Sequence, residues 1–227
     1  MEQGQFCFIK DEFFDKYDNE RKLMRNDESV IDADGNKRGR PCFYAFKDKK
    51  NPMILWCVPI SSRVEKYKRI YNQKLDRQRE RGTKAPKCNT IRFGEVMGVE
   101  KAFLIQNMFP IIEKYIGDIY INRLTQKAVR IPQHIEQDII FHAGEVLRLV
   151  RSGNKNLVFS DILATFGNLN SELKQIEIPA PSQPEPYQEA KVKETLHAAL
   201  ERNKARVQCD DIDREKQGTL GKQSPEK

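Results

Sequence analysis

The segment that most constrains the fold is a continuous apolar run at residues 53–58 (MILWCV), which leads into Pro-Ile-Ser-Ser at residues 59–62. An unbroken apolar run of this length is typical of a strand that is buried on both faces. Such a strand needs other strands beside it and further elements across its faces. The run therefore predicts the central strand of a layered domain, with the hydroxyls of Ser61 and Ser62 at its end.

The flanking sequence predicts an α+β domain built on a curled antiparallel sheet with surrounding helices. Ser62 and Glu65 have the spacing of a capping box, which predicts Ser62 as the N-cap of a helix that follows the central strand. Ser160 is expected to cap a short helix over residues 161–166. Further strands are expected at residues 5–10 and 41–46 and in a hairpin, 89–93 with 99–106, and further helices at residues 11–17 and 132–152.

The composition changes after the expected core elements. Residues 1–172 are expected to form one domain, and residues 173–227 a linker, a polar helix and a disordered tail. The Pro-rich stretch 179–186 (PAPSQPEP) favours an extended backbone and offers no core material. Residues 210–227 are too polar to bury a core of their own.

The cysteines favour a reducing compartment. The chain has 5 of them, widely spread, which makes a poor disulfide framework. Cys7, Cys42 and Cys57 fall in expected strands, where a free cysteine packs as a small apolar residue. Because the chain shows neither a secretory leader nor an apolar run long enough to cross a membrane, we expect a cytoplasmic protein without a membrane partner.

The positive charge is concentrated in two stretches. The chain has 40 Lys and Arg against 33 Asp and Glu, but residues 63–92 alone hold eleven basic and three acidic side chains, and residues 37–50 hold six and one. A solvated helix face usually mixes its signs, whereas a concentrated positive field attracts a polyanion, most often a nucleic acid. The cations expected to bind a nucleic acid are Lys37, Arg38, Arg63, Lys68, Arg69, Lys74, Arg77 and Arg81.

Several common chemistries lack their sequence motifs. The 3 histidines do not stand at ligand spacing with one another or with carboxylates, so no metal site is expected. The chain has neither a GxSxG nucleophile elbow nor a GxxxxGK[ST] phosphate loop. No cofactor is expected.

What remains is a group of hydroxyls and cations around the end of the central strand. A helix that begins after Ser61 and Ser62 offers free N–H groups to an anion, and Arg40 and Lys66 would add positive charge. Such a site can stabilise a pentacoordinate phosphorus. An RNA 2′-hydroxyl that attacks its own phosphate needs orientation, charge stabilisation and proton transfer, but no protein nucleophile. For Ser62 alone, helix capping is the commoner use.

Four segments resemble, in order, the ToxN/AbiQ endoribonucleases of type III toxin–antitoxin systems, and the CptN-type members most of all. They are residues 6–9 (FCFI), 40–44 (RPCFY), 58–69 (VPISSRVEKYKR) and 102–115 (AFLIQNMFPIIEKY), and the resemblance covers about residues 5–165.

Specific family positions can be matched within these segments. The family's key Thr or Ser corresponds to Ser61, followed by Ser62, and a family basic residue corresponds to Arg40. The lysine that the family places just after the hydroxyls has Arg63 or Lys66 as its counterpart. A family aromatic residue upstream of the basic one has no equivalent in residues 29–39.

The resemblance implies a MazF/Kid-like toxin fold and metal-independent cleavage of cellular RNA, leaving a 2′,3′-cyclic phosphate. It also implies growth inhibition or anti-phage abortive infection, and an inhibitory partner. That partner is a small structured RNA from tandem repeats, which the toxin processes and holds in a ring-shaped protein–RNA assembly. The residues alone leave two other interpretations open: a non-catalytic basic module that binds RNA or DNA, and a structural protein whose basic helix is merely solvated.

Overall fold

The predicted central strand is β3 (Ile54–Ser61), and all of its residues are buried. The computed structural model describes residues 1–26 and 39–176. β3 continues through Pro59, whose carbonyl accepts a hydrogen bond from the N–H of Leu104 at 3.0 Å. One edge of β3 pairs with β2 (Cys42–Lys47). The other edge changes partner, because β6 (Phe109–Ile112) pairs with its first half and β5 (Val99–Phe103) with Ile60 and Ser61.

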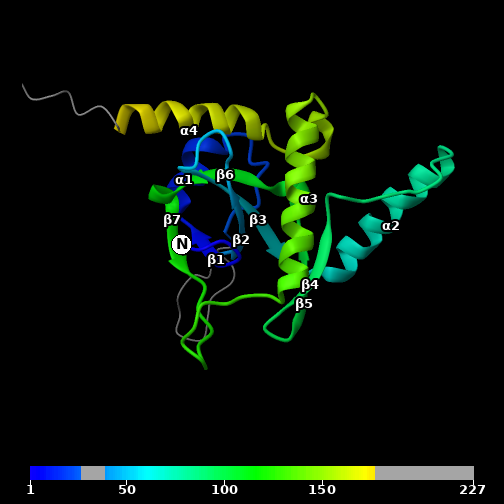
Figure 1. Cartoon of the computed structure of the whole chain (residues 1–227), viewed down its shortest axis with the longest axis horizontal. Coiled ribbons are helices and arrows are strands. Elements are labelled where there is room, and N and C mark those ends of the chain that lie inside the picture. The colour runs from blue at the N-terminus through cyan, green and yellow to red at the C-terminus, as the bar shows by residue number, and fades with distance from the viewer. Residues whose placement is uncertain (27–38, 177–227) are drawn as a thin grey trace, which may run out of the picture. The chain divides into compact units, whose positions relative to one another are not determined.

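The described residues form an antiparallel sheet of 7 strands in the order β4-β5-β3-β2-β1-β7, with β6 beside β3 (Figure 1). The prediction of an α+β domain with an antiparallel sheet is therefore confirmed. Pro110 lies in β6, which pairs with β3 alone among the described strands, as expected for a residue that cannot donate to a ladder. The remaining strands are β1 (Phe6–Ile9), β4 (Arg92–Val96) and β7 (Ile116–Ile119).

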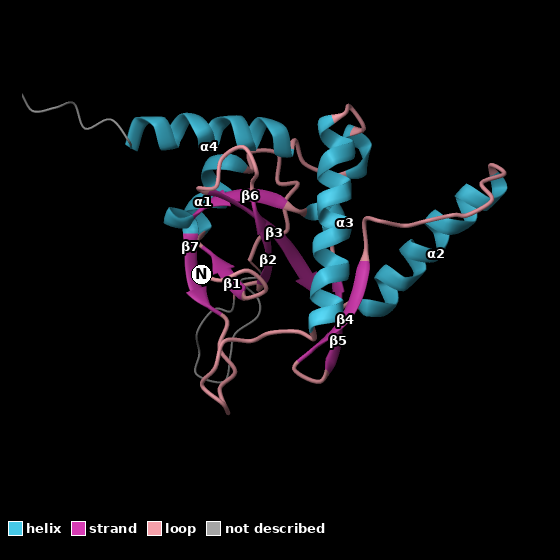
Figure 2. Ribbon diagram, in the orientation of Figure 1, coloured by secondary structure: helices cyan, strands magenta, loops and turns pink. Residues whose placement is uncertain are grey.

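Both faces of the sheet are covered, which explains the unbroken apolar run in β3. Trp56 and Val58 face a core that includes the inner side of α3 (Gln133–Arg151). Cys57 faces the opposite core, which α1 (Asp11–Tyr17) and α4 (Ile162–Ile176) complete. Figure 2 shows α3 and α4 beside the strands. Short 3-10 helices lie at Ile105–Asn107, Glu113–Tyr115 and Lys155–Leu157.

The cysteines of the three adjacent strands are free and buried, as predicted. Cys7 on β1 lies opposite Cys42 on β2, and Cys57 on β3 faces the same core. Their side chains therefore contribute apolar volume between the sheet and the α1 and α4 helices.

The helix that follows β3 is α2 (Val64–Glu80), and it packs beside β5 through one apolar face. Tyr67 is buried there, with Tyr71 and Leu75 partly buried against the same cluster. The predicted capping box is wrong, since Arg63 occupies the N-cap position and no side chain caps the helix. In Figure 1 the far end of α2 extends away from the sheet.

Two other local predictions name the right element and the wrong bounds. The hairpin turns over two residues only, Met97 and Gly98, both with positive φ, as in type I′ turns. The helix expected at residues 161–166 is α4, which continues to Ile176 because its apolar face keeps packing on the core. Asp161 rather than Ser160 caps it, since the Asp161 carboxylate accepts the N–H of Ala164 at 3.0 Å.

Residues 173–176, expected to begin the linker, belong to α4, and the rest of the expected linker, helix and tail lies outside the described residues. Two of the predicted RNA-binding residues, Lys37 and Arg38, also lie outside them. Within residues 1–26 and 39–176, none of the helices is both long and apolar enough to cross a membrane.

A buried carboxylate joins α4 to α1. Glu172 accepts hydrogen bonds from Lys16 at 2.9 Å, Lys114 at 3.0 Å and Tyr115 at 2.7 Å, and another from Tyr17. Burial alone would raise the pKa of Glu172, but these hydrogen bonds lower it to about 2. The ionised carboxylate is therefore favoured in the folded chain.

We expect Glu172→Gln to reduce the free energy of unfolding at pH 7 by about 3 kcal/mol or less, from the size of the pKa shift. The folded pKa is depressed, so the carboxylate stabilises the fold above the unfolded pKa of 4.5 and loses this effect as the pH falls towards 2. Urea unfolding of both proteins at pH 7 and pH 3 checks this. A difference as large at pH 3 as at pH 7 would contradict the electrostatic explanation.

Candidate active site

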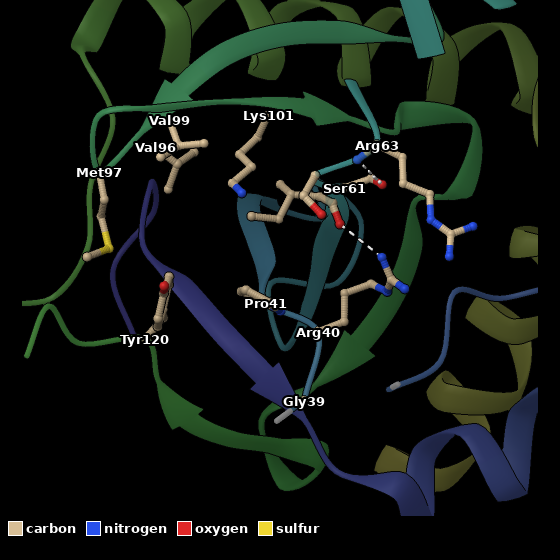
Figure 3. A pocket seen from close by; sticks show the side chains of 12 residues that line it. Gly39, Arg40, Pro41, Ser61, Arg63, Val96, Met97, Val99, Lys101 and Tyr120 are labelled. Carbon is tan, nitrogen blue, oxygen red and sulfur yellow. Dashed lines mark hydrogen bonds between the residues drawn. The ribbon is translucent and has the colours of Figure 1, made fainter. Parts of the chain in front are cut away.

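A pocket of about 580 Å³ lies at the end of β3, where the sheet passes from β2 to β5 (Figure 3). It collects segments that are far apart in the sequence: the start of β2, the β3–α2 junction, the β4–β5 hairpin and the residue after β7. Its lining residues are Gly39, Arg40, Pro41, Ile60, Ser61, Ser62, Arg63, Val96, Met97, Val99, Lys101 and Tyr120.

Ser61 is the buried hydroxyl of this pocket, with 5% of the residue exposed, whereas the neighbouring Ser62 is exposed. The Ser61 backbone is fixed by pairing opposite Ala102 on β5. Its Oγ accepts a hydrogen bond from the backbone N–H of Arg63 at 3.2 Å. Because the oxygen acts as an acceptor there, the hydroxyl proton is available for donation to a ligand.

Arg40 lines the same pocket, and main-chain atoms orient its guanidinium. Nη1 donates to the carbonyl of Ile60 at 3.3 Å, and Nε donates to the carbonyl of Arg25 at 3.3 Å. The Arg40 backbone N–H donates to the side chain of Asn26 at 2.9 Å. These bonds leave further guanidinium N–H groups for a ligand, since arginine has five donors.

Lys101 enters the pocket from β5. It shares a strand face with Phe103 of the core, so its side chain projects from the inner side of the sheet. In Figure 3 it reaches toward the end of β3 from the side opposite Arg40. The Lys101 ammonium has no hydrogen bond or ion pair with any residue that the structure describes, although the residue is half-buried. An unpaired, half-buried ammonium in a pocket favours an anionic ligand.

All charged residues in the pocket lining are positive. It holds Arg40, Arg63 and Lys101 and no Asp or Glu. Within the described parts of the chain, none of these three cations pairs with a carboxylate. The arrangement can hold a phosphodiester and stabilise added negative charge on it. Within residues 1–26 and 39–176, no group of His, Cys, Asp and Glu side chains could hold a metal ion.

The predicted site residues are brought together in part. Ser61, Ser62, Arg40 and Arg63 share the pocket. Lys66 does not line it: this exposed residue lies in the first turn of α2, with its Nζ 5.8 Å from the ring centroid of Tyr67. Of the two candidates for the family lysine position, Arg63 is therefore the one at the pocket.

The cations predicted to bind RNA along α2 divide into two groups. Lys68 pairs with Glu100 at 2.8 Å. Lys74 donates to Thr90 at 2.7 Å and to Gln106 at 2.6 Å, and burial lowers its pKa, which makes it a packing residue rather than a surface cation. Between residues 63 and 81, the exposed cations without a carboxylate partner among the described residues are Arg63, Lys66, Arg69, Arg77 and Arg81.

Sequence reasoning missed Lys101, Met97 and Tyr120. Lys101 is a single cation in a short strand, and only the pairing of β5 with β3 brings it to Ser61. The alternation of Val99, Lys101 and Phe103 was the available signal, since it puts the lysine on the core side of a strand.

Comparisons with known proteins give a limited result. Neither a family model nor a curated protein matches the chain. Among solved structures, one described as "Structure and activity of AbiQ, a lactococcal anti-phage endoribonuclease belonging to the type-III toxin-antitoxin system" is similar at 16% identity and a TM-score of 0.44. The match covers 74% of this chain and 98% of that one.

Proposed function

We propose that this chain is an endoribonuclease that cleaves RNA by attack of a 2′-hydroxyl on the adjacent phosphate. The observation that supports this best is the pocket around the Ser61 hydroxyl, whose lining holds three cations and no Asp or Glu. A phosphodiester bound there gains negative charge as it becomes pentacoordinate, and fixed cations and O–H donors stabilise that charge.

The chemistry assigned to the pocket is a transesterification. The 2′-oxygen forms a bond to phosphorus as its proton passes to water, and the bond from phosphorus to the 5′-oxygen of the next nucleotide breaks as that oxygen takes a proton from water. The products are a 2′,3′-cyclic phosphate and a 5′-hydroxyl. Ser61 donates a hydrogen bond to a non-bridging phosphate oxygen and keeps its proton, and Arg40 and Lys101 stabilise the charge on either side.

The sequence resemblance supports the same site. Its segments at residues 40–44 and 58–69 meet at the pocket, which Arg40 and Ser61 both line. On this basis the protein acts as the toxin of a type III toxin–antitoxin system in the cytoplasm, inhibited by a small repeat RNA in a ring-shaped assembly. The unpaired cations of α2 hold the phosphates of this RNA. Sequencing of the RNA that copurifies with the protein tests the partner, and a tandem-repeat transcript is the expected result.

The nuclease proposal predicts that pure protein cuts labelled RNA in the presence of EDTA. The fragments should carry a 2′,3′-cyclic phosphate and a 5′-hydroxyl, and a 2′-O-methyl version of the same RNA should bind without being cut, because it lacks the attacking hydroxyl. Mass spectrometry of the fragments provides the measurement.

Three other outcomes contradict the proposal in different ways. Salt-dependent binding of both RNAs without cleavage identifies the chain as a non-catalytic binding module. Absence of binding at moderate salt identifies a structural protein. Cleavage that EDTA abolishes identifies a metal-dependent nuclease.

A further inference from the structure

We propose that the apolar end of the pocket is a nucleobase subsite, in which Met97 and Tyr120 hold a base next to the scissile phosphate. This inference rests on the proposed function and adds the groups that contact the base. The cations and hydroxyls occupy one part of the pocket, and four side chains without formal charge form the other: Val96, Met97, Val99 and Tyr120. In Figure 3 Met97 and Tyr120 lie together, on the far side of Lys101 from Arg40.

The β4–β5 turn presents apolar side chains to solvent. Met97 is 47% exposed and Val99 is 53% exposed, although both line the pocket. Met97 also has φ 54, a left-handed conformation that L-residues other than Asn and Asp seldom adopt, and it precedes Gly98 at φ 76. Asn is the usual residue at such a turn position, so the methionine does not stabilise the turn itself. Its side chain instead adds an adaptable apolar surface to the pocket.

Tyr120 provides a rigid aromatic surface. Its backbone N–H donates to the carbonyl of Phe6 at 2.8 Å, and its carbonyl accepts the N–H of Val129 at 2.8 Å. Its ring meets Phe8 edge-on, with ring centroids 5.5 Å apart. The Tyr120 hydroxyl has no hydrogen-bond partner among the residues that the structure describes. A ring fixed in this way can stack with a base without losing conformational freedom, and its hydroxyl remains free to bond to the base edge.

The two ends of the pocket match the two parts of a nucleotide. Lys101 lies between them and reaches toward Ser61 (Figure 3). A phosphate held by Lys101, Ser61 and Arg40 places the attached nucleoside within the same pocket, and one of the two neighbouring bases then faces Met97 and Tyr120. The occupant is therefore a base of the bound RNA rather than a separate molecule, because the apolar lining is continuous with the cationic lining.

The experiment compares Met97→Gly and Tyr120→Leu with the wild-type chain on an RNA that the wild-type chain cuts. Gly suits the backbone at Met97, so that variant removes the side chain and keeps the turn. We expect each variant to lower kcat/KM roughly 5- to 100-fold, as for the loss of one stacked base. Tyr120→Phe should recover most of the loss. Met53→Gly is the matched control, since Met53 is 54% exposed outside this pocket, and its activity should be unchanged.

Abasic substrates separate a base subsite from a structural role. Removing the base on one side of the scissile phosphate should slow the wild-type chain and abolish its advantage over Met97→Gly. If the wild-type chain keeps its higher kcat/KM over Met97→Gly on both abasic substrates, the subsite proposal is wrong. A 2′-O-methyl RNA carrying 2-aminopurine tests binding without cleavage. Its fluorescence should be quenched by the wild-type chain and not by Tyr120→Leu, even if the chain proves not to be a nuclease. Equal quenching by both also overturns the proposal.

Discussion

Ser61→Ala should lower the rate of RNA cleavage about 10²- to 10³-fold, the usual cost of removing one donor that stabilises transition-state charge. A loss of this size should abolish toxicity when the protein is expressed. The expectation follows from the position of the hydroxyl, which accepts the Arg63 N–H and keeps its own proton for the phosphate. Single-turnover cleavage of labelled RNA measures the effect.

Two further variants distinguish chemistry from folding at this position. Ser61→Thr keeps the hydroxyl and should retain most of the activity, while Ser152→Ala, at the exposed end of α3, should behave as wild type. Thermal unfolding of Ser61→Ala should stay close to that of the wild-type chain. Full toxicity of Ser61→Ala would refute the assignment of the hydroxyl.

Lys101→Met should lower kcat about 10²-fold or more, because it removes a cation that stabilises the phosphate in the transition state. The lysine has no carboxylate partner among the described residues, so its loss leaves no buried charge unpaired and the fold should tolerate the change. The separate measurement of kcat and KM checks the prediction, since a residue that only attracts RNA would mainly change KM.

The charge itself can be tested at the same position. Lys101→Arg keeps the positive charge and should restore part of the rate. Lys155→Met removes an exposed lysine on a 3-10 helix outside this pocket and should leave the rate unchanged. If Lys101→Met and Lys155→Met had the same kcat, the role given to Lys101 would be wrong.

The core of the fold could be predicted from local pattern. The apolar run of β3 predicts a strand buried on both faces, and the spacing of Tyr67, Tyr71 and Leu75 predicts the packed face of α2. The exact helix ends could not be predicted in this way, because several neighbouring polar residues can each act as the N-cap. Ser61 bonds the N–H of Arg63 where Ser62 was expected to act as N-cap, and Asp161 caps α4 in place of Ser160.

The candidate site was accessible to sequence reasoning only where its residues adjoin the central strand. Ser61 is the last residue of β3 and Ser62 follows it directly, and Arg40 comes just before β2, which pairs along β3. Lys101 and Tyr120 reach the pocket through pairing that no local pattern specifies: β5 contacts β3 only at its end, and β7 comes from the opposite edge of the sheet. Lys66 illustrates the reverse error, since nearness in sequence to Ser61 did not bring it into the pocket.

Two peptide carbonyls, those of Ile60 and Arg25, orient the guanidinium of Arg40 by accepting its hydrogen bonds. Peptide oxygens are present whatever side chains these positions carry. Homologous chains could therefore exchange the neighbours of this arginine freely and still aim it at the same point, provided that the backbone path stays the same. Differences in the side chains around Arg40 would then not indicate that a homologous pocket has lost its cation.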